Sequence, residues 1–245
     1  MSKKGIYWFT TDLRLDDNPA LKLAAEAMDQ LIFIYCIDNP TRISHLQVGH
    51  SLSENRQNFL QASLNDLNTQ LEALGQHLVV IENTSSKLTQ LIEDHQITHI
   101  YINADHHILD SNELLKTKVR YPQINYHEVS NNRLFRLDQL PFELGELPDS
   151  FSKFRRKAEK LKIDSPLSTP NYLPPPMTDP IPWSKQPNQT TEAQPLFKGG
   201  EIEGVRHMHT YFQSDLPSTY KQTRNRLDGM DYSTKFSPWL AQGCL

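Results

Sequence analysis

The sequence predicts an α/β protein built on a parallel five-stranded sheet with flanking helices. Over residues 1–130, short apolar runs of strand-like composition alternate with helical patterns. The run 30–37 is apolar almost throughout, as expected of a strand buried on both faces. Strands separated by helices pair in parallel through right-handed crossovers, so these observations together favour a layered α/β sheet.

Each element has its own local signal. The expected strands lie at residues 5–10, 30–37, 77–81, 99–103 and 124–129. Asp16, Asp17 and Asn18 precede Pro19 and a helical segment that runs to Met28, as in a capped helix. Further helices are expected at 86–95, with Leu88, Leu91 and Ile92 inward, and more weakly at 109–119.

The second helix has the clearest pattern. Ser51 and Glu54 form a capping box, which predicts where this helix begins. Leucines then recur in steps of four and three residues, which places them on one face of the helix. These leucines are Leu60, Leu64, Leu67, Leu71 and Leu74.

Residues 136–200 have a different composition. Eleven of the sixteen prolines lie between Pro141 and Pro195, which predicts an extended, semi-rigid linker. It contains one helical island, 151–162, with six cations and one acid. This island would dock through an apolar stripe of Phe151, Phe154, Ala158 and Leu161. Its charges fit either a solvated face or contact with nucleic-acid phosphates.

The tail contains a candidate anion site. Helix 201–212 is expected to pack through Ile202, Val205, Met208 and Phe212. Further on, Ser237 is a suitable N-cap and Pro238 a suitable first helical residue. Two hydroxyls and a cation lie just upstream, in Ser233, Thr234 and Lys235. This is the chemistry that holds a phosphate at a helix entrance, although a Ser-Pro cap can also be purely structural.

Several function classes are disfavoured. A net charge of −4 gives no overall attraction to nucleic acid, so a DNA site must be a local patch. Cys36 has the pattern of a buried thiol and lies far from Cys244 in the sequence, which indicates a reducing compartment. We therefore expect a cytoplasmic protein with no signal peptide and no membrane span. His106 and His107, beside Asp105 and Asp110, lack the spacing of a metal site, so no metal is expected.

The first strand-to-helix loop also argues against one cofactor class. It contains no glycine between Thr10 and Asn18, so a dinucleotide fingerprint of the NAD type is absent. Within this loop Asp12, Arg14 and Asp17 suggest an ion-paired, structural arrangement.

Five separated motifs nevertheless resemble the DNA photolyase/cryptochrome family, and most of all its DASH cryptochrome branch. They are the runs 7–21, 140–157 and 197–201, Tyr220 with Arg224 and Asn225, and Asp231 through Ala241. Thr10 departs from the family, which commonly has an arginine there. The resemblance implies an α/β antenna domain at 1–135, a linker with a basic helix at 136–200, and the start of a helical FAD-binding domain at 201–245.

The same resemblance implies site residues and cofactors. Contacts to the flavin's phosphates and ribityl chain fall on Tyr220, Ser233, Thr234, Lys235, Phe236 and Ser237. A DNA phosphate contact falls on Arg224, and no residue of this chain is assigned a catalytic role. Some family members also bind a folate antenna pigment, for which His107 or Asp110 is the nearest match here.

Complete family members use light-excited reduced FAD to split cyclobutane pyrimidine dimers, and DASH members favour single-stranded DNA. Leu245 falls where the family's helical domain is only beginning, so we expect weak or no FAD binding and no repair by this chain alone. The alternatives are a stand-alone antenna, nucleotide-binding or blue-light-signalling module, and a fragment with no independent role. An uncovered helical face would favour self-association.

Overall fold

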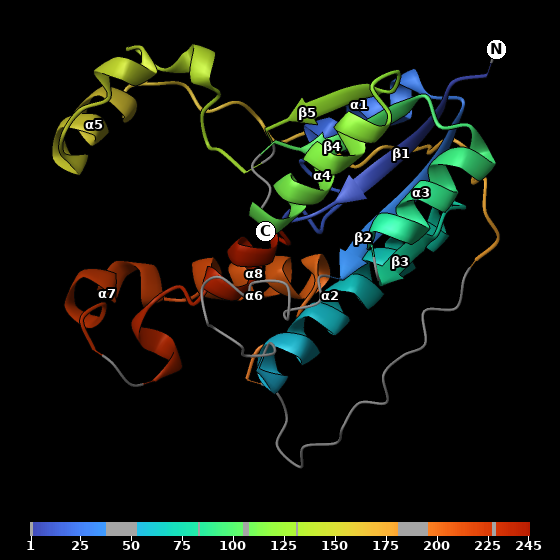
Figure 1. The fold of residues 1–245 in the computed structure, drawn as a ribbon. Coiled ribbons are helices and arrows are strands. Elements are labelled where there is room, and N and C mark those ends of the chain that lie inside the picture. Colours follow the sequence, from blue (N-terminus) through green and yellow to red (C-terminus); the bar gives the residue numbers. More distant parts are fainter. Residues whose placement is uncertain are drawn as a thin grey trace.

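The protein forms an α/β unit followed by a helical tail, as seen in a computed structural model (Figure 1). The structure describes residues 2–37, 53–82, 84–104, 108–130, 132–180, 196–226 and 229–245. Among these residues, no helix has both the length and the apolar character needed to cross a bilayer.

The sheet has five parallel strands in the order β3-β2-β1-β4-β5, which confirms the predicted fold class. The strands are β1 (Lys4–Phe9), β2 (Gln30–Ile37), β3 (Leu78–Glu82), β4 (His99–Asn103) and β5 (Asn125–Val129). The chain order reverses between β1 and β4, because the first three strands extend to one side and the last two to the other. In such a sheet the crevice at the carboxyl ends of these two strands is the usual ligand position.

Helices cover both faces of the sheet. They are α1 (Pro19–Ala27), α2 (Glu54–Ala73), α3 (Thr84–His95) and α4 (Ile108–Arg120). The side chains of α1 and α2 join one apolar cluster with Tyr7, Phe9 and Phe33, whereas α3 and α4 join a second cluster with Trp8 and Ile34. Alternate residues of the central strand therefore feed two separate cores, as the period of two requires.

The helical patterns are confirmed in this unit. Asn18 caps α1, because its side-chain oxygen accepts the N–H of Leu21. The predicted leucine face of α2 is confirmed, because Leu64, Leu67 and Leu71 are buried and Leu60 and Leu74 pack beside them. Helix α2 begins at Glu54 after Ser53, while Ser51 lies outside the described residues.

Part of the proline-rich segment is fixed against the α/β unit. Asp17 accepts the N–H of Leu167 at 3.0 Å, and Asp16 accepts the N–H of Thr169 at 3.0 Å. Leu173 is buried in the core, and the carbonyl of Pro175 accepts the N–H of Leu31. The prediction of an unpacked linker is therefore wrong for this stretch, because its backbone groups pair with loop carboxylates and strand ends.

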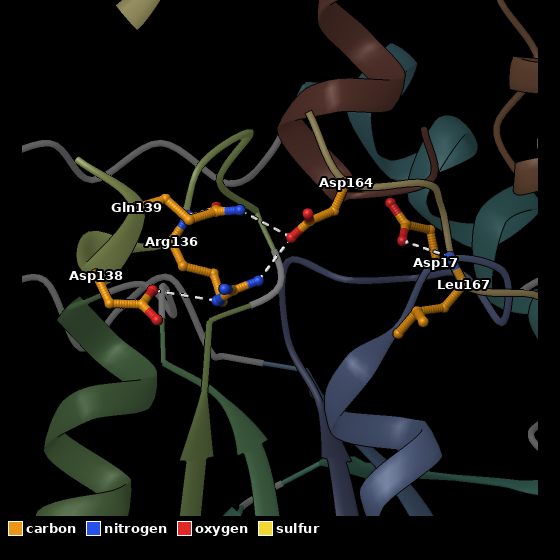
Figure 2. A network of polar contacts seen from close by, with 6 residues as sticks. All are labelled: Asp17, Arg136, Asp138, Gln139, Asp164 and Leu167. Atoms are coloured by element: carbon orange, nitrogen blue, oxygen red, sulfur yellow. Dashed lines mark hydrogen bonds and ion pairs between the residues drawn. The ribbon is translucent and has the colours of Figure 1, made fainter. Parts of the chain in front are cut away.

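An arm of residues 136–164 is closed at its two ends. Arg136 donates to the carboxylate of Asp164 at 2.6 Å, and Gln139 donates to the same carboxylate at 2.8 Å (Figure 2). Between these ends lie the 3-10 helices η3 (Leu137–Gln139) and η4 (Leu144–Glu146) and the basic helix α5 (Phe151–Ala158). The arm extends away from the sheet (Figure 1).

Helix α5 ends four residues earlier than expected and docks through fewer side chains. Ala158 is buried, and Phe154 packs edge-to-face on Phe142 at 5.9 Å between ring centroids. Phe151, however, is 75% exposed, so its predicted docking role is wrong. As the first residue of the helix, it lies a full turn away from the contact that Phe154 makes.

The tail contains α6 (Glu201–Gln213), α7 (Leu216–Thr223), η5 (Met230–Tyr232) and α8 (Ser237–Gln242). The buried residues of α6 are Glu201, Gly204 and Tyr211. The predicted packing face is wrong for Ile202 and Phe212, which are more than half exposed, whereas Val205 and Met208 are partly buried. Contacts are made instead at Glu201 and Gly204, which lie beside the apolar residues that the hydrophobic pattern predicted as the packing face.

Glycines allow the tail to approach the α/β unit closely. A Cβ on Gly199 would lie 2.0 Å from the carbonyl oxygen of Phe59, and one on Gly243 would lie 1.9 Å from that of Thr11. Gly243 also has a left-handed backbone, with φ of 64°, and ends α8. Both contacts are with backbone, which cannot move aside as a flexible side chain can.

We expect Gly199→Ala to lower the free energy of unfolding by about 2 kcal/mol or more, because its methyl group would overlap the backbone of α2. Gly145→Ala is the matched control, because a Cβ there meets nothing within 4 Å. It should change stability by about 0.5 kcal/mol or less. Denaturant unfolding of both variants measures the difference, and similar losses would contradict this packing.

Candidate functional site

The candidate site is the loop between η5 and α8, held by an aromatic cluster. Phe236 packs against His207 and Tyr211 at ring-centroid distances of 5.6 and 5.7 Å. Trp239 stacks on His207 at 4.9 Å and donates its indole N–H to the carbonyl of Lys198 at 3.1 Å. Ring contacts of this kind fix a loop from both ends at little cost in side-chain entropy.

Main-chain contacts add to this support. His207 Nε2 lies 2.8 Å from the carbonyl oxygen of Thr234, and the hydroxyl of Thr223 donates to the carbonyl of Tyr232 at 3.4 Å. Helix α7 packs beside η5 through this second contact. The loop is therefore joined to both α6 and α7.

The predicted N-cap is displaced by one residue. Phe236 holds the cap position, its carbonyl accepts the N–H of Leu240, and Ser237 begins the helix with Pro238 second. Lys235 has a left-handed backbone, with φ of 54°, and turns the chain just before the helix. Such a conformation is uncommon for a residue with a Cβ and marks a constrained turn.

The structure brings most of the predicted cofactor residues into one short loop. Ser233, Thr234, Lys235 and Phe236 are partly buried, and Ser237 is exposed. Tyr220 lies on α7 and is 40% exposed, whereas Arg224 ends α7 and is exposed. Thr234 and Lys235 thus remain accessible to solvent rather than buried in the apolar interior.

The donor set of this loop suits a phosphate group. Three hydroxyls, of Ser233, Thr234 and Ser237, and the ammonium of Lys235 lie within five residues. Hydroxyls and an ammonium provide hydrogen-bond donors and positive charge without an acidic competitor in the loop. These residues fit a cofactor that has phosphates, as a flavin dinucleotide does.

A buried junction places this loop against the α/β unit. The carboxylate of Glu201 accepts the N–H of Leu15 at 2.9 Å and that of Asp16 at 3.0 Å. Asp66, on α2, accepts the N–H of Ile202 at 3.3 Å. Sequence analysis missed both carboxylates, although Glu201 ends the Phe197-to-Glu201 motif.

The C-terminal end of α8 adds a second connection. Arg14 donates to the carbonyl of Gly243 at 3.0 Å and to that of Asp17 at 3.0 Å, while Leu13 donates to the carbonyl of Gln242 at 3.1 Å. Asp12 accepts the hydroxyl of Tyr7 at 2.7 Å. The loop after β1 is thus a docking surface for the tail.

The thiol of Cys244 is enclosed at this junction. It is fully buried, and burial raises its pKa to about 11, well above the ordinary thiol value. A thiol of this kind is a poor nucleophile at neutral pH, so its role is packing.

Other predicted features lie partly outside the described residues. Asp105, His106 and His107 lie outside the described residues, and so does the side chain of Asp110. Within the described ranges, no group of three or more His, Cys, Asp or Glu side chains could hold a metal ion.

Two buried polar atoms lie near the carboxyl end of β1. Within the part of the chain that the structure describes, the indole nitrogen of Trp8 and the hydroxyl of Thr10 have no hydrogen-bond partner. Trp8 is fully buried and Thr10 is 4% exposed. Unpaired buried donors of this kind call for a partner such as water or a ligand.

Comparison with known proteins places the chain in a family. The DNA photolyase family model matches residues 5–175. The cryptochrome DASH of Idiomarina loihiensis is 40% identical over 244 residues, covering 98% of this chain and 54% of that protein. That of Vibrio parahaemolyticus is 40% identical over 252 residues, covering 100% and 56%.

Solved structures agree. A Synechocystis cryptochrome has a TM-score of 0.80 at 31% identity, covering 100% of this chain and 54% of that one. A class III photolyase from Agrobacterium tumefaciens shares the fold, with a TM-score of 0.79 at 22% identity. The chain spans about half the length of the curated relatives that it matches. It belongs to the DNA photolyase family, and both curated relatives described above are DASH cryptochromes.

Proposed function

We propose that this chain supplies the antenna-type α/β unit and the first part of a flavin-binding site of a DASH-type photolyase. The observation that carries this is the loop of Ser233 through Ser237, which presents hydroxyls and a cation to solvent on a rigid aromatic support. The division at residues 135 and 200 is part of the same proposal.

When bound, light-excited reduced FAD supplies the electron that splits the cyclobutane ring of a pyrimidine dimer in DNA. The residues of this chain bind and orient. By resemblance to the family, Lys235 and the neighbouring hydroxyls would hold the phosphates, and Tyr220 and Phe236 would add contacts to the phosphates and the ribityl chain. The protein's part in such chemistry is to place the cofactor and keep its surroundings fixed.

A second function has a specific observation in its favour. The unpaired donors of Trp8 and Thr10 lie at the carboxyl side of the sheet, where the chain order reverses. A ligand at this edge would have to displace neighbouring side chains to reach them, because both are buried, and by resemblance to the family a folate pigment is the candidate. In that case the chain acts as an antenna or blue-light-signalling module without catalysis.

An absorbance spectrum of the purified chain after incubation with FAD, and separately with a reduced folate, tests both functions. We expect weak, substoichiometric FAD binding, because this chain provides only the loop of Ser233 through Ser237 and its support. Lys235→Glu should weaken it further, while Lys87→Glu, on α3, should not. Stoichiometric flavin retained through purification would contradict the expected weakness, and equal FAD binding by both variants would contradict the loop assignment. Folate binding without FAD binding would favour the antenna function.

DNA contact is the third part of the proposal. On the basic arm, Lys153 pairs with Asp149 at 2.9 Å and Arg155 with Glu159 at 3.4 Å. Arg156, Lys160 and Lys162 are exposed and form no ion pair within the described residues. Together with Arg224 they are free to contact phosphates, whose neutralisation releases counterions.

We expect Lys160→Glu/Lys162→Glu to weaken binding of a single-stranded oligonucleotide and to reduce its salt dependence. Losing two phosphate contacts should lower the slope of log K against log salt by about 1.4. Lys22→Glu/Lys87→Glu changes the net charge equally, on α1 and α3, and should leave that slope nearly unchanged. Fluorescence anisotropy at several salt concentrations measures both, and equal slopes would contradict a local site.

A further inference from the structure

Three side chains form a junction between α2, α6 and the loop after β1, which we call the acid joint: Asp66 and Gln70, which are partly buried, and Glu201, which is buried. The side-chain nitrogen of Gln70 donates to both carboxylates, at 3.1 Å to Asp66 and 3.1 Å to Glu201. Asp66 accepts from the first turn of α6, and Glu201 accepts from the loop after β1. The joint therefore connects three elements through two carboxylates and one amide.

The charges around the joint do not neutralise it. Among the described residues, the cation that lowers the pKa of Asp66 is Lys198, whose side chain is 67% exposed. Asp16, on the facing loop, repels Glu201, and the fully buried Cys244 contributes no positive charge. The buried carboxylate of Glu201 and the partly buried carboxylate of Asp66 thus face mainly neutral donors, so their loss of hydration is only partly offset.

We propose that the acid joint is a proton-sensitive latch, which holds α6 more tightly on the α/β unit when one of its carboxyl groups is protonated. A proton taken from solvent onto a carboxylate oxygen removes one enclosed negative charge. On Asp66 the hydrogen bonds from Ile202 and Gln70 both go to Oδ2, so a proton on Oδ1 leaves these contacts in place, whereas both oxygens of Glu201 already accept backbone N–H groups. The latch would act whether or not a cofactor is bound.

The expected change in the stability of the joint with pH follows from the pKa shifts of its two carboxyl groups. Burial raises the pKa of Asp66 and of Glu201 above their ordinary values, and it outweighs the hydrogen bonds that act the other way. The closed joint thus binds protons more readily than the open one. Its stabilisation is complete below the ordinary carboxyl pKa and is lost as pH rises through the raised pKa.

Thermal unfolding of the whole protein would not isolate the pH response of the acid joint. Burial lowers the pKa of His77, His99 and His127, and His99 stacks on His127 at 5.5 Å. Protonation of these histidines destabilises the folded sheet as pH falls below about 6.5, which opposes the response of the joint. A local readout is therefore needed.

Amide hydrogen exchange at Leu15, Asp16 and Ile202 provides it, since opening the joint frees all three N–H groups. After correction for intrinsic exchange, we expect their protection to rise as pH is lowered from neutrality toward the ordinary carboxyl pKa, by up to about tenfold per pH unit for each proton taken up. Asp66→Asn should flatten this rise, because it removes one titrating group. Asp94→Asn, an exposed carboxylate on α3, should not.

If Asp66→Asn does not fold, Gln70→Glu serves instead. It adds a third carboxyl group to the joint and should steepen the rise. Protection that stays constant or falls as pH is lowered would overturn the proposal. So would an Asp66→Asn protein with the unmodified pH dependence, or a Gln70→Glu protein with no steeper one.

Discussion

The helical tail depends on one buried carboxylate for its place on the α/β unit. Glu201 is 6% exposed and accepts two backbone N–H groups of the loop after β1. Asp66 accepts the N–H of Ile202, in the first turn of α6. Leaving those donors unpaired inside the protein would cost their full desolvation, so the contact fixes both position and angle.

Close packing follows from this constraint. Gly199 and Gly204 allow the tail's backbone to approach Phe59 and Trp239, and the indole N–H of Trp239 returns to Lys198. The stack of Trp239 on His207 then supports the loop of Ser233 through Ser237. A chain of contacts thus connects the sheet to the candidate phosphate site, so the loop is part of a rigid framework despite its lack of regular structure.

Much of the fold could be predicted because its signals are local. The apolar run of β2 and the leucines of α2 have a period that identifies a buried strand and a helix face without any tertiary information. Ser233 through Ser237 share one loop because they are consecutive in the sequence, and their contacts with a flavin stay a prediction.

The errors lie where tertiary contacts decide. The packing face of α6 could not be read from hydrophobicity, because its contact positions are Glu201, which caps another element, and Gly204, which makes room for an indole. The cap of α8 moved from Ser237 to Phe236 because Lys235 takes a left-handed turn. The arm around α5 was expected to dock through Phe151, but that side chain is exposed, and the ends of the arm are joined by polar contacts of Arg136 and Gln139 with Asp164.

Glu201 holds the tail in place on the α/β unit, and denaturant unfolding of Glu201→Ala tests this most directly. The matched variant is Glu203→Ala, on the same helix turn, whose carboxylate pairs, among the residues that the structure describes, with the side chains of Lys198 and Arg206. Glu201→Ala should lose about 2–4 kcal/mol, because two enclosed N–H groups lose their acceptor. Glu203→Ala should lose about 1 kcal/mol or less. Equal losses in the two variants would contradict the claim.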